Sequence, residues 1–321
     1  MARKQRKDLK LSDCWLYAVA SPADLAERLS TKGNKLTVKD LRGLAADEGN
    51  FQLFHLVNDK GKSRAIQWPK RRLQKIHSRV HTLLSRVAVP AYLHSAVEGK
   101  SYISNAVAHE CAVSVVKIDI KKFFPSVSRA AVFKFFAGPL RCRRDVAGLL
   151  ADILTYNAHL PTGGAASPII AYYSFKEMFD EIDHLARSRG VTMTCYVDDM
   201  ALSGPRANKG LLRDIQQIIS KHGLKSHKAH KFAASEPKVV TGVCITANGP
   251  RVPNKLHLKI KSGFEDLSAA ETSSAKAKAL GPLIGRMEAA GQIDPTFKAR
   301  AKTLRDQQFK LFQATQIIPR V

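Results

Sequence analysis

The sequence predicts an α+β fold, and three observations support this class. Residues 71–87 place apolar side chains at helical spacing, whereas residues 112–120 form a β-branched run that is typical of a buried strand. No internal repeat or low-complexity linker interrupts the chain, so its segments are expected to form one continuous body. Helices and strands follow one another in a mixed order, which favours α+β layers over a doubly wound parallel sheet.

The N-terminal part is expected to contain short helices, then a hairpin, then a longer helix. Residues 1–48 predict the short helices. Residues 51–57 and 64–68 predict paired strands, because the turn sequence NDKGK separates them and Pro69 ends the second. The helix at 71–87 follows, with a basic face opposite its apolar face.

The central and C-terminal elements are predicted by the same criteria. Helices are expected at 127–136, 144–156, 169–187 and 209–222, and strands at 112–120, 191–196, 200–202 and 239–246. Ser167 and Pro168 open the long helix at 169–187 as its cap and its first-turn proline. From about residue 254 the chain is expected to be helical and basic.

Composition narrows the class of partner. The 321 residues include 52 Lys and Arg against 27 Asp and Glu, which gives a formal net charge of +25. This excess favours a polyanionic partner, and an apolar content of 45% excludes a wholly disordered chain. No apolar run reaches the length of about 18 residues that a membrane span needs. The five isolated cysteines indicate neither a disulfide framework nor a zinc site, so a reducing cytoplasm is the expected location.

The sharpest local signal is a pair of adjacent acids, Asp198 and Asp199, between two apolar strands. Neighbouring carboxylates resist burial unless a cation neutralises them, so this segment is either a divalent-metal site or a solvated hairpin turn. A third acid, Asp119, stands near the end of the buried strand at 112–120, where an unpaired charge is costly. Its structural alternatives are a strand-end cap or an ion pair with Lys121.

A glycine-rich loop, LPTGGAASP at 160–168, leads into a helix. Such a loop exposes backbone N–H groups that suit a phosphate or a closely approaching base pair, although an ordinary loop with a good helix cap has the same composition. Taken together and in this order, Asp119 with FFPS at 123–126, the glycine-rich loop, and the YVDD box that begins at Tyr196 resemble the palm motifs of reverse transcriptases.

Two further elements narrow the resemblance to one branch. They are similar to the NAxxH and VTG elements of bacterial retron reverse transcriptases, and consist of Asn105 and His109 in NAVAH and of Val240, Thr241 and Gly242. The chain therefore resembles a retron-type RNA-directed DNA polymerase over roughly residues 51–297.

The sequence also departs from the family pattern. Thr162 stands where many reverse transcriptases have Gln. The later family motif, usually Asn followed by a lysine, is altered here, so three residues are candidates for the place of that lysine: Lys228, His230 and Lys231.

The resemblance implies a right-hand polymerase with fingers, palm and helical thumb. N-terminal helices and fingers would occupy residues 1–110, the palm with its antiparallel sheet and YVDD hairpin 111–247, and an RNA-binding thumb 248–321. Basic residues of the thumb would contact RNA phosphates, unless they form a solvated face: Lys255, Lys259, Lys276, Lys278 and Arg286.

The resemblance also implies the catalytic residues and their cofactor. Asp119, Asp198 and Asp199 would form the catalytic triad. Together with the carbonyl of Ile120 they would hold two Mg²⁺ ions, for which Mn²⁺ could substitute.

The remaining implied site residues would bind the dNTP. Arg64 and Lys62 at the hairpin tip would contact the triphosphate. Phe124 would act as a steric gate that rejects a 2′-hydroxyl, and Thr162 and Gly163 would line the base-pair side of the pocket.

In function, the resemblance implies a retron enzyme that copies part of its cognate non-coding RNA (msr–msd) into branched msDNA. It would prime from the 2′-hydroxyl of a guanosine, within an antiphage defence system that includes an effector protein and a host RNase H in trans. The alternatives are another bacterial reverse transcriptase, of the group II intron or abortive-infection type, or a catalytically idle RNA-binding scaffold on a polymerase fold.

Overall fold

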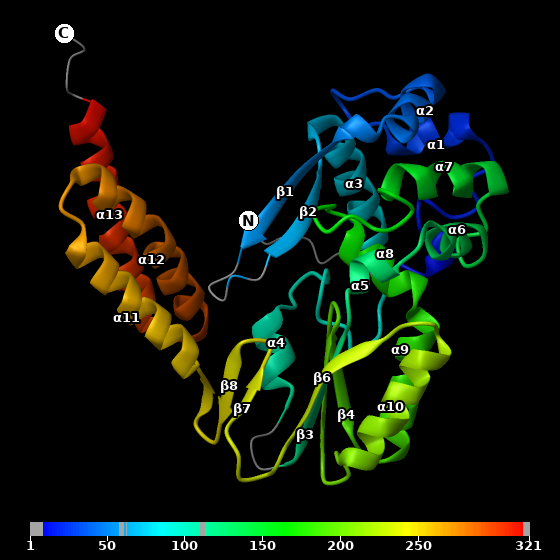
Figure 1. Cartoon of the computed structure of the whole chain (residues 1–321). Helices are drawn as coiled ribbons and strands as arrows, with labels where there is room; N and C mark the ends of the chain where they lie inside the picture. Colours follow the sequence, from blue (N-terminus) through cyan, green and yellow to red (C-terminus); the bar gives the residue numbers. More distant parts are fainter. Residues whose placement is uncertain (1–8, 58–60, 62, 110–112, 317–321) are drawn as a thin grey trace. The chain divides into compact units, whose positions relative to one another are not determined.

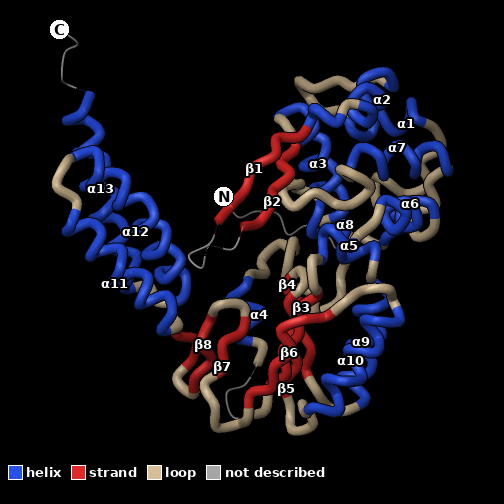
Figure 2. Tube along the Cα trace, viewed as in Figure 1, coloured by secondary structure: helices blue, strands red, loops and turns tan. Residues whose placement is uncertain are grey.

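The computed structural model describes residues 9–57, 61, 63–109 and 113–316, and the chain divides into two compact units (Figure 1). The first unit contains the described residues up to Ser101 together with Val116–Lys231. The second contains the described residues of Tyr102–Val115 and those from Phe232 onward. Each unit contains both helices and strands, as the predicted α+β class requires (Figure 2).

The N-terminal helices are η1 Leu11–Asp13, α1 Pro22–Leu29, α2 Val38–Ala46, η2 Glu48–Asn50 and α3 Arg71–Leu84. Two of them, α1 and α2, begin with side-chain caps. The Ser21 hydroxyl accepts the Asp24 N–H at the start of α1, and Thr37 and Asp40 form a reciprocal capping box on α2. Helix α3 buries an apolar face and leaves its basic face outside, as its sequence predicts.

The predicted hairpin is confirmed. Strand β1 (Phe51–Val57) pairs antiparallel with β2 (Ser63–Pro69), with Phe51 opposite Pro69 and Val57 opposite Ser63.

The helices that follow correct one prediction. They are α5 Phe123–Ser126, α6 Arg129–Ala137, α7 Arg144–Leu154, α8 Ser167–Ser174, α9 Lys176–Ser188 and α10 Lys209–Lys221. The single helix expected at 169–187 is therefore two helices, which break at Phe175 (φ −126°, ψ 22°). The break lets the Phe175 ring pack 6.1 Å from the Phe123 ring. An aromatic contact of this kind outweighs the continuous helical spacing of the sequence.

The main sheet has four strands in the order β4-β5-β3-β6, with α9 and α10 packed beside it (Figure 1). Its strands are β3 Val115–Ile120, β4 Thr192–Tyr196, β5 Asp199–Ser203 and β6 Ser226–Phe232. The sequence did not predict β6, because SHKAHKF lacks the apolar alternation of a half-buried strand. Its place beside β3 brings residues from the two strands to one site.

The second unit joins a small sheet to three long helices. Its elements are α4 Tyr102–Val107, β7 Lys238–Val240, β8 Val243–Thr246, β9 Gly249–Arg251, α11 Asn254–Ala269, α12 Ser273–Ile293 and α13 Thr296–Gln316. The strand expected at 239–246 is wrong: Thr241 (φ 45°) and Gly242 (φ 83°) form a tight turn between β7 and β8. The helical C-terminal part is confirmed, and its helices enclose their own apolar core.

None of the helices in the described part of the chain is long and apolar enough to cross a membrane. The described cysteines are all free, three of them buried and Cys244 partly exposed, whereas Cys111 lies outside the described residues.

Candidate active site

Asp119 stands on the face of β3 that is turned away from the core. Val116, Ile118 and Ile120 are fully buried, and they alternate along the strand with Lys117 and Asp119. Because successive side chains of a strand point to opposite faces, Lys117 and Asp119 share the second face, where both are partly exposed.

Asp198 and Asp199 belong to the tight connection between β4 and β5, in which Val197 and Asp198 form the turn. Val197 has φ 62°, a left-handed conformation that is rare for a β-branched residue, and its N–H donates to the Ser95 hydroxyl at 3.0 Å. The Ile120 N–H donates to the Asp198 carbonyl at 3.0 Å. The first bond ties the turn to Ser95, and the second ties it to the end of β3. Because β5 is also the neighbour of β3 in the sheet, the three acids come together at this end.

The carboxylates perturb one another. Burial raises the pKa of Asp198 to about 6, and the negative charges of Asp119 and Asp199 add to the rise. Burial also raises the pKa of Asp199, while the Lys117 ammonium 3.3 Å away opposes that rise. The site is therefore a partly buried cluster of like charges that requires positive charge for neutralisation.

Two side chains of β6 contact Asp119, and the Lys228 ammonium supplies part of that charge. The His227 ring nitrogen Nε2 lies 2.6 Å from one carboxylate oxygen, and Lys228 Nζ lies 2.7 Å from the other. The structural alternative of an ion pair with Lys121 is thus wrong, because strand order places β6 rather than Lys121 beside the carboxylate. Of the three candidates for the later lysine, Lys228 is the one that contacts an acid of the cluster.

Sequence reasoning missed His227, and it gave no role to Lys117 or Ser95. The segment 226–232 reads SHKAHKF and carries no period of two, so no local signal would have placed His227 on a strand. No local pattern connects Ser95 to a turn 102 residues later.

The acids fit a divalent cation by their chemistry. Carboxylate oxygens are hard ligands of the kind that Mg²⁺ requires, and a cation would relieve both the burial and the mutual repulsion that raise the pKa of Asp198. Within the described ranges no group of three or more His, Cys, Asp or Glu side chains has the arrangement to hold a metal. The oxygens of Asp119 are engaged by His227 and Lys228 instead.

The glycine-rich loop lies along the free edge of β2. Gly163 N–H donates to the Gln67 carbonyl at 3.0 Å, and the Gln67 N–H donates to the Thr162 hydroxyl at 3.2 Å. A Cβ atom at Gly163 would stand 2.7 Å from the Gln67 carbonyl oxygen. Glycine is therefore required here by close approach to the hairpin backbone.

The second glycine of the loop is packed as tightly. A Cβ atom at Gly164 would stand 2.7 Å from Ser167 Oγ and 2.8 Å from His77 Nδ1. The Ser167 hydroxyl donates to the Pro161 carbonyl at 2.7 Å and makes no cap, because α8 already begins at Ser167. The predicted capping role of Ser167 is therefore wrong.

The two adjacent phenylalanines after Asp119 differ in how far they are buried. Phe123 is 3% exposed and packs against Phe175 and Phe179, whereas Phe124 is partly exposed. Phe124 is thus the ring of the pair that a ligand can reach.

Of the two hairpin cations expected to bind the triphosphate, Arg64 lies among the described residues and Lys62 does not. Arg64 is an exposed residue of β2 and pairs with Leu56 of β1. Lys62 lies outside the described residues.

The two elements that mark the retron branch meet inside the second unit. The Asn105 side-chain amide donates to the Thr241 hydroxyl at 3.4 Å, and that hydroxyl donates to the Tyr102 carbonyl at 2.7 Å. Asn105 is fully buried and His109 is 3% exposed. The contacts join α4 to the β7–β8 turn, so these residues act on the local fold of this unit.

The basic residues of the C-terminal helices divide into two groups. Lys255, Lys276 and Lys278 are exposed. Arg286 and Lys259 are partly buried, and the Arg286 guanidinium donates to the Lys259 carbonyl at 2.9 Å, which joins α12 to α11.

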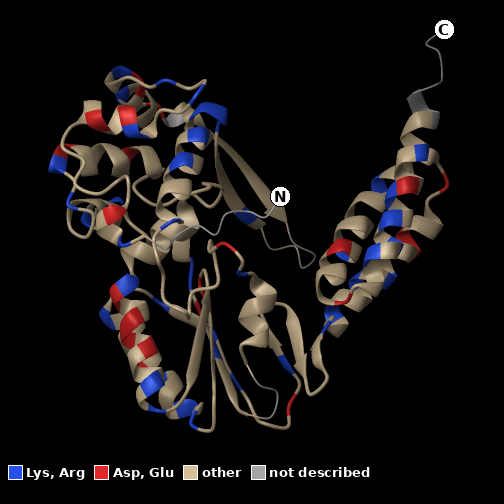
Figure 3. Cartoon of the chain, turned by 180° about the vertical axis from the view of Figure 1, so that it is seen from behind, with Lys and Arg blue, Asp and Glu red and all other residues tan. Residues whose placement is uncertain are grey.

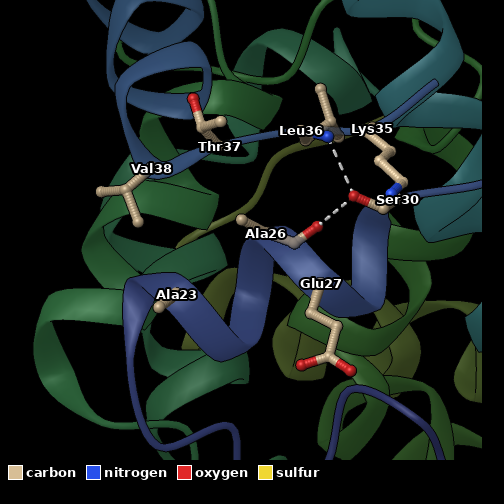
Figure 4. Close-up of a pocket in the computed structure, with 8 residues that line it drawn as sticks. All are labelled: Ala23, Ala26, Glu27, Ser30, Lys35, Leu36, Thr37 and Val38. Atoms are coloured by element: carbon tan, nitrogen blue, oxygen red, sulfur yellow. Dashed lines mark hydrogen bonds between the residues drawn. The ribbon is translucent and has the colours of Figure 1, made fainter.

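A pocket of about 390 Å³ between α1 and α2 shows no comparable chemistry (Figure 4). The Ser30 hydroxyl in it donates to the Ala26 carbonyl and accepts the Leu36 N–H, so this hydroxyl is satisfied within the protein.

Known proteins resemble the chain in this same region. Residues 56–245 match the family described as reverse transcriptase (RNA-dependent DNA polymerase). The retron Se72 reverse transcriptase of Salmonella heidelberg is 27% identical over 215 residues, which cover 63% of this chain and 57% of that protein. The retron Ec48 and Ec86 reverse transcriptases of Escherichia coli are 25% and 26% identical, over 85% and 76% of this chain and 73% and 78% of their own lengths. The match to the Se72 protein thus spans little more than half of that relative. The predicted resemblance to retron reverse transcriptases is confirmed.

Proposed function

Since this chain belongs to the reverse transcriptase family, we propose that it is the RNA-directed DNA polymerase of a retron. The observation that best supports this activity is the convergence of Asp119, Asp198 and Asp199 at the end of β3. A cluster of partly buried carboxylates at the ends of adjacent strands is what phosphoryl transfer from a dNTP needs for metal binding.

In this proposal Asp119, Asp198 and Asp199, with the carbonyl of Ile120, hold divalent ions, most simply two Mg²⁺. When bound, such ions supply charge neutralisation for the primer oxygen and for the leaving pyrophosphate. Lys228 holds the Asp119 carboxylate in place in their absence. Removal of one acid is expected to cost orders of magnitude in rate, because the residues act as a unit.

The dNTP is proposed to bind against the surface that the hairpin and the glycine-rich loop form together. Arg64, and Lys62 beside it, would contact the triphosphate, since an arginine fork matches phosphate oxygens. Phe124 is the accessible ring after Asp119, and a ring in that place would clash with a 2′-hydroxyl. Thr162 and Gly163 would line the base-pair side.

We also propose that the chain has the parts of a right-hand polymerase, with fingers in residues 1–110, palm in 111–247 and thumb in 248–321. On the proposed thumb, the exposed side chains of Lys255, Lys276 and Lys278 are suited to phosphates of a folded RNA.

The proposed substrate is the enzyme's own structured non-coding RNA, part of which is copied into branched msDNA from a guanosine 2′-hydroxyl. The reaction would take place in the cytoplasm, with a host RNase H and an effector protein of an antiphage system acting in trans.

The test is to sequence nucleic acid that copurifies with the protein expressed from its native locus, for the wild type and for Asp198→Asn. The matched control is Asp145→Asn, an exposed acid on α7. A short discrete DNA joined covalently to one RNA, present in wild type and control and absent in Asp198→Asn, is the expected result.

Two outcomes would contradict the proposal. RNA alone in all three samples would indicate a binding scaffold without polymerase activity. Unbranched, heterogeneous DNA that depends on Asp198 would indicate a reverse transcriptase of another branch.

A further inference from the structure

A short stretch of backbone, residues 92–95, lies along the outer edge of β4 within the first unit. We call it the edge segment. It joins β4 by a parallel bridge at Cys195, whose N–H donates to the Tyr92 carbonyl at 2.7 Å. The His94 N–H in turn donates to the Cys195 carbonyl at 2.9 Å. The edge segment therefore extends the main sheet beyond β4, and its last residue, Ser95, reaches the turn between β4 and β5.

The edge segment is anchored by contacts away from the three acids. The Tyr92 side chain is buried, and its hydroxyl donates at 2.7 Å to the carboxylate of Asp180 on α9, a helix rich in acidic residues (Figure 3). Lys100 Nζ donates to the Leu93 carbonyl at 2.8 Å. Each of these bonds includes a charged group, which makes it stronger than a bond between neutral groups. The place of Ser95 beside the turn is thus set by the surrounding fold.

Ser95 contacts the strained residue of the turn. Its side chain is buried, and its hydroxyl accepts the Val197 N–H at 3.0 Å. Val197 has φ 62°, and a β-branched residue keeps this left-handed conformation only where its surroundings determine it. The Val197 carbonyl is engaged as well, since Cys195 Sγ donates to it at 3.6 Å. The Ser95 hydroxyl therefore helps to hold the residue that directly precedes Asp198.

The conformation of Val197 determines where Asp198 points. The Asp198 carbonyl accepts the Ile120 N–H at 3.0 Å, so the turn is held towards β3 on one side and towards the edge segment on the other. Without the bond from Ser95, Val197 would be free to relax towards negative φ, which would turn the following peptide and move the Asp198 carboxylate. A misplacement of about 1 Å at a reacting centre costs about 100-fold in rate.

We propose that Ser95 is a positioning residue of the polymerase reaction: its hydroxyl holds Val197 in the left-handed conformation that directs Asp198 towards Asp119. Ser95 acts through the Val197 backbone rather than on the substrate. This proposal rests on the proposed polymerase function for the reaction that the positioning serves.

The experiment uses the full-length protein and three variants. Ser95→Ala removes the hydroxyl, and Ser95→Cys keeps a side chain of similar size that is only a weak acceptor. The control is Ser128→Ala, which removes a serine hydroxyl that accepts the Ala131 N–H at 3.2 Å at the start of α6. The control therefore loses the same kind of bond at a helix cap. Urea unfolding establishes that each variant is folded, and if Ser95→Ala does not fold, Ser95→Cys decides.

Single-nucleotide incorporation on a primed template gives kcat and the KM for dNTP. In Ser95→Ala, kcat should fall by about tenfold to 100-fold while KM changes by less than about threefold, because the bond acts on the placement of Asp198 in the transition state. Ser95→Cys should lose about tenfold in kcat. Ser128→Ala should stay within about twofold of the wild type, although it loses a bond of the same kind.

A second measurement does not depend on turnover. Amide hydrogen exchange, followed by mass spectrometry of the peptide that contains Val197, reports on the bond itself. The Val197 N–H should exchange about tenfold faster in Ser95→Ala than in the wild type, because its acceptor is gone. Ser128→Ala should leave the exchange of this peptide unchanged.

Three results would overturn the proposal: a kcat within about twofold of the wild type in either Ser95 variant, an equal loss of kcat in Ser128→Ala, or unchanged exchange of the Val197 N–H in Ser95→Ala. Active wild type with Ser95 variants that behave like the control would reject the role of Ser95 alone. Faster exchange in Ser95→Ala, in a protein whose wild type incorporates no dNTP, would reject the polymerase function and keep the contact between Ser95 and the turn.

Discussion

Lys228 Nζ lies 2.7 Å from a carboxylate oxygen of Asp119, although 109 residues separate the two in sequence. The contact exists because β6 is the neighbour of β3 in the main sheet. Burial raises the pKa of both Asp198 and Asp199, and the Lys228 ammonium opposes that rise. Lys228 thus favours the ionised form of these two acids while it contacts the third.

We predict that Lys228→Ala lowers dNTP incorporation by about tenfold or more, because the acids lose a fixed positive charge that keeps them ionised and ordered. Lys228→Arg should retain most of the activity, since it keeps that charge. Single-nucleotide incorporation on a primed template measures both. Lys225→Ala, on an exposed neighbour, is the control and should have no effect. A comparable loss in Lys231→Ala with an active Lys228→Ala would assign the role to Lys231 instead.

A second prediction separates stability from activity at the acids. Burial and the charge of Asp119 raise the pKa of Asp198 to about 6 in the folded state, from the ordinary value of 3.8, so its charge destabilises the folded state at neutral pH. Asp198→Asn should therefore stabilise the protein by about 2 kcal/mol in buffer without divalent ions, while abolishing incorporation. Urea unfolding in the presence of a chelator measures the gain. Asp145→Asn should give no gain in unfolding free energy. A lower unfolding free energy for Asp198→Asn would show that the repulsion among the three acids is already relieved in the folded protein.

A third prediction concerns the glycine-rich loop. In Gly163→Ala the new Cβ would meet the Gln67 carbonyl oxygen at 2.7 Å, and neither backbone can yield without moving the hairpin. We expect a loss of about 1–3 kcal/mol in unfolding free energy, as for other overpacked sites, and a larger KM for dNTP. Gly285→Ala, at a helical position with open space, is the control and should be neutral or slightly stabilising. Unchanged stability of Gly163→Ala would mean that the loop does not hold this contact in solution.

Local sequence signals predicted much of this fold because they act over a few residues. The hairpin at 51–69, the helix at 71–84 and the acids at the β4–β5 turn each follow from periodicity or from turn chemistry. The break at Phe175 did not, because it depends on the distant ring of Phe123. For the same reason the turn at Thr241 was missed, since the contacts of that residue with Asn105 and Tyr102 come from α4.

The candidate site shows the same division. Its acids stand out in the sequence as charges between apolar strands, and their juxtaposition was available only through the family resemblance. The two side chains that contact Asp119, those of His227 and Lys228, come from a strand without apolar alternation. Strand order in a sheet is a property of the whole fold, so local patterns do not reveal it.

The last prediction concerns acid sensitivity beneath the glycine-rich loop, where His77 is fully buried. Its Nε2 lies 3.0 Å from the Ile153 carbonyl, which the neutral ring satisfies by donation. Among the described side chains, none pairs with its Nδ1, which faces Gly164. A second proton on the ring would have no acceptor, and burial lowers the pKa of His77 from 6.5 to about 4.

The sign follows from proton uptake. Between about pH 6.5 and pH 4 the unfolded chain binds a proton at His77 that the folded chain rejects, so the unfolding free energy falls as the pH falls through this range. The loss from this residue is about 3 kcal/mol. His77→Gln keeps an amide donor and removes the titration, so its unfolding free energy should fall less steeply with acid than that of the wild type. His55→Gln, on an exposed strand residue, serves as the control and should match the wild-type slope. Urea unfolding across this pH range decides the matter, because parallel curves for wild type and His77→Gln would mean that His77 is protonated equally in both states.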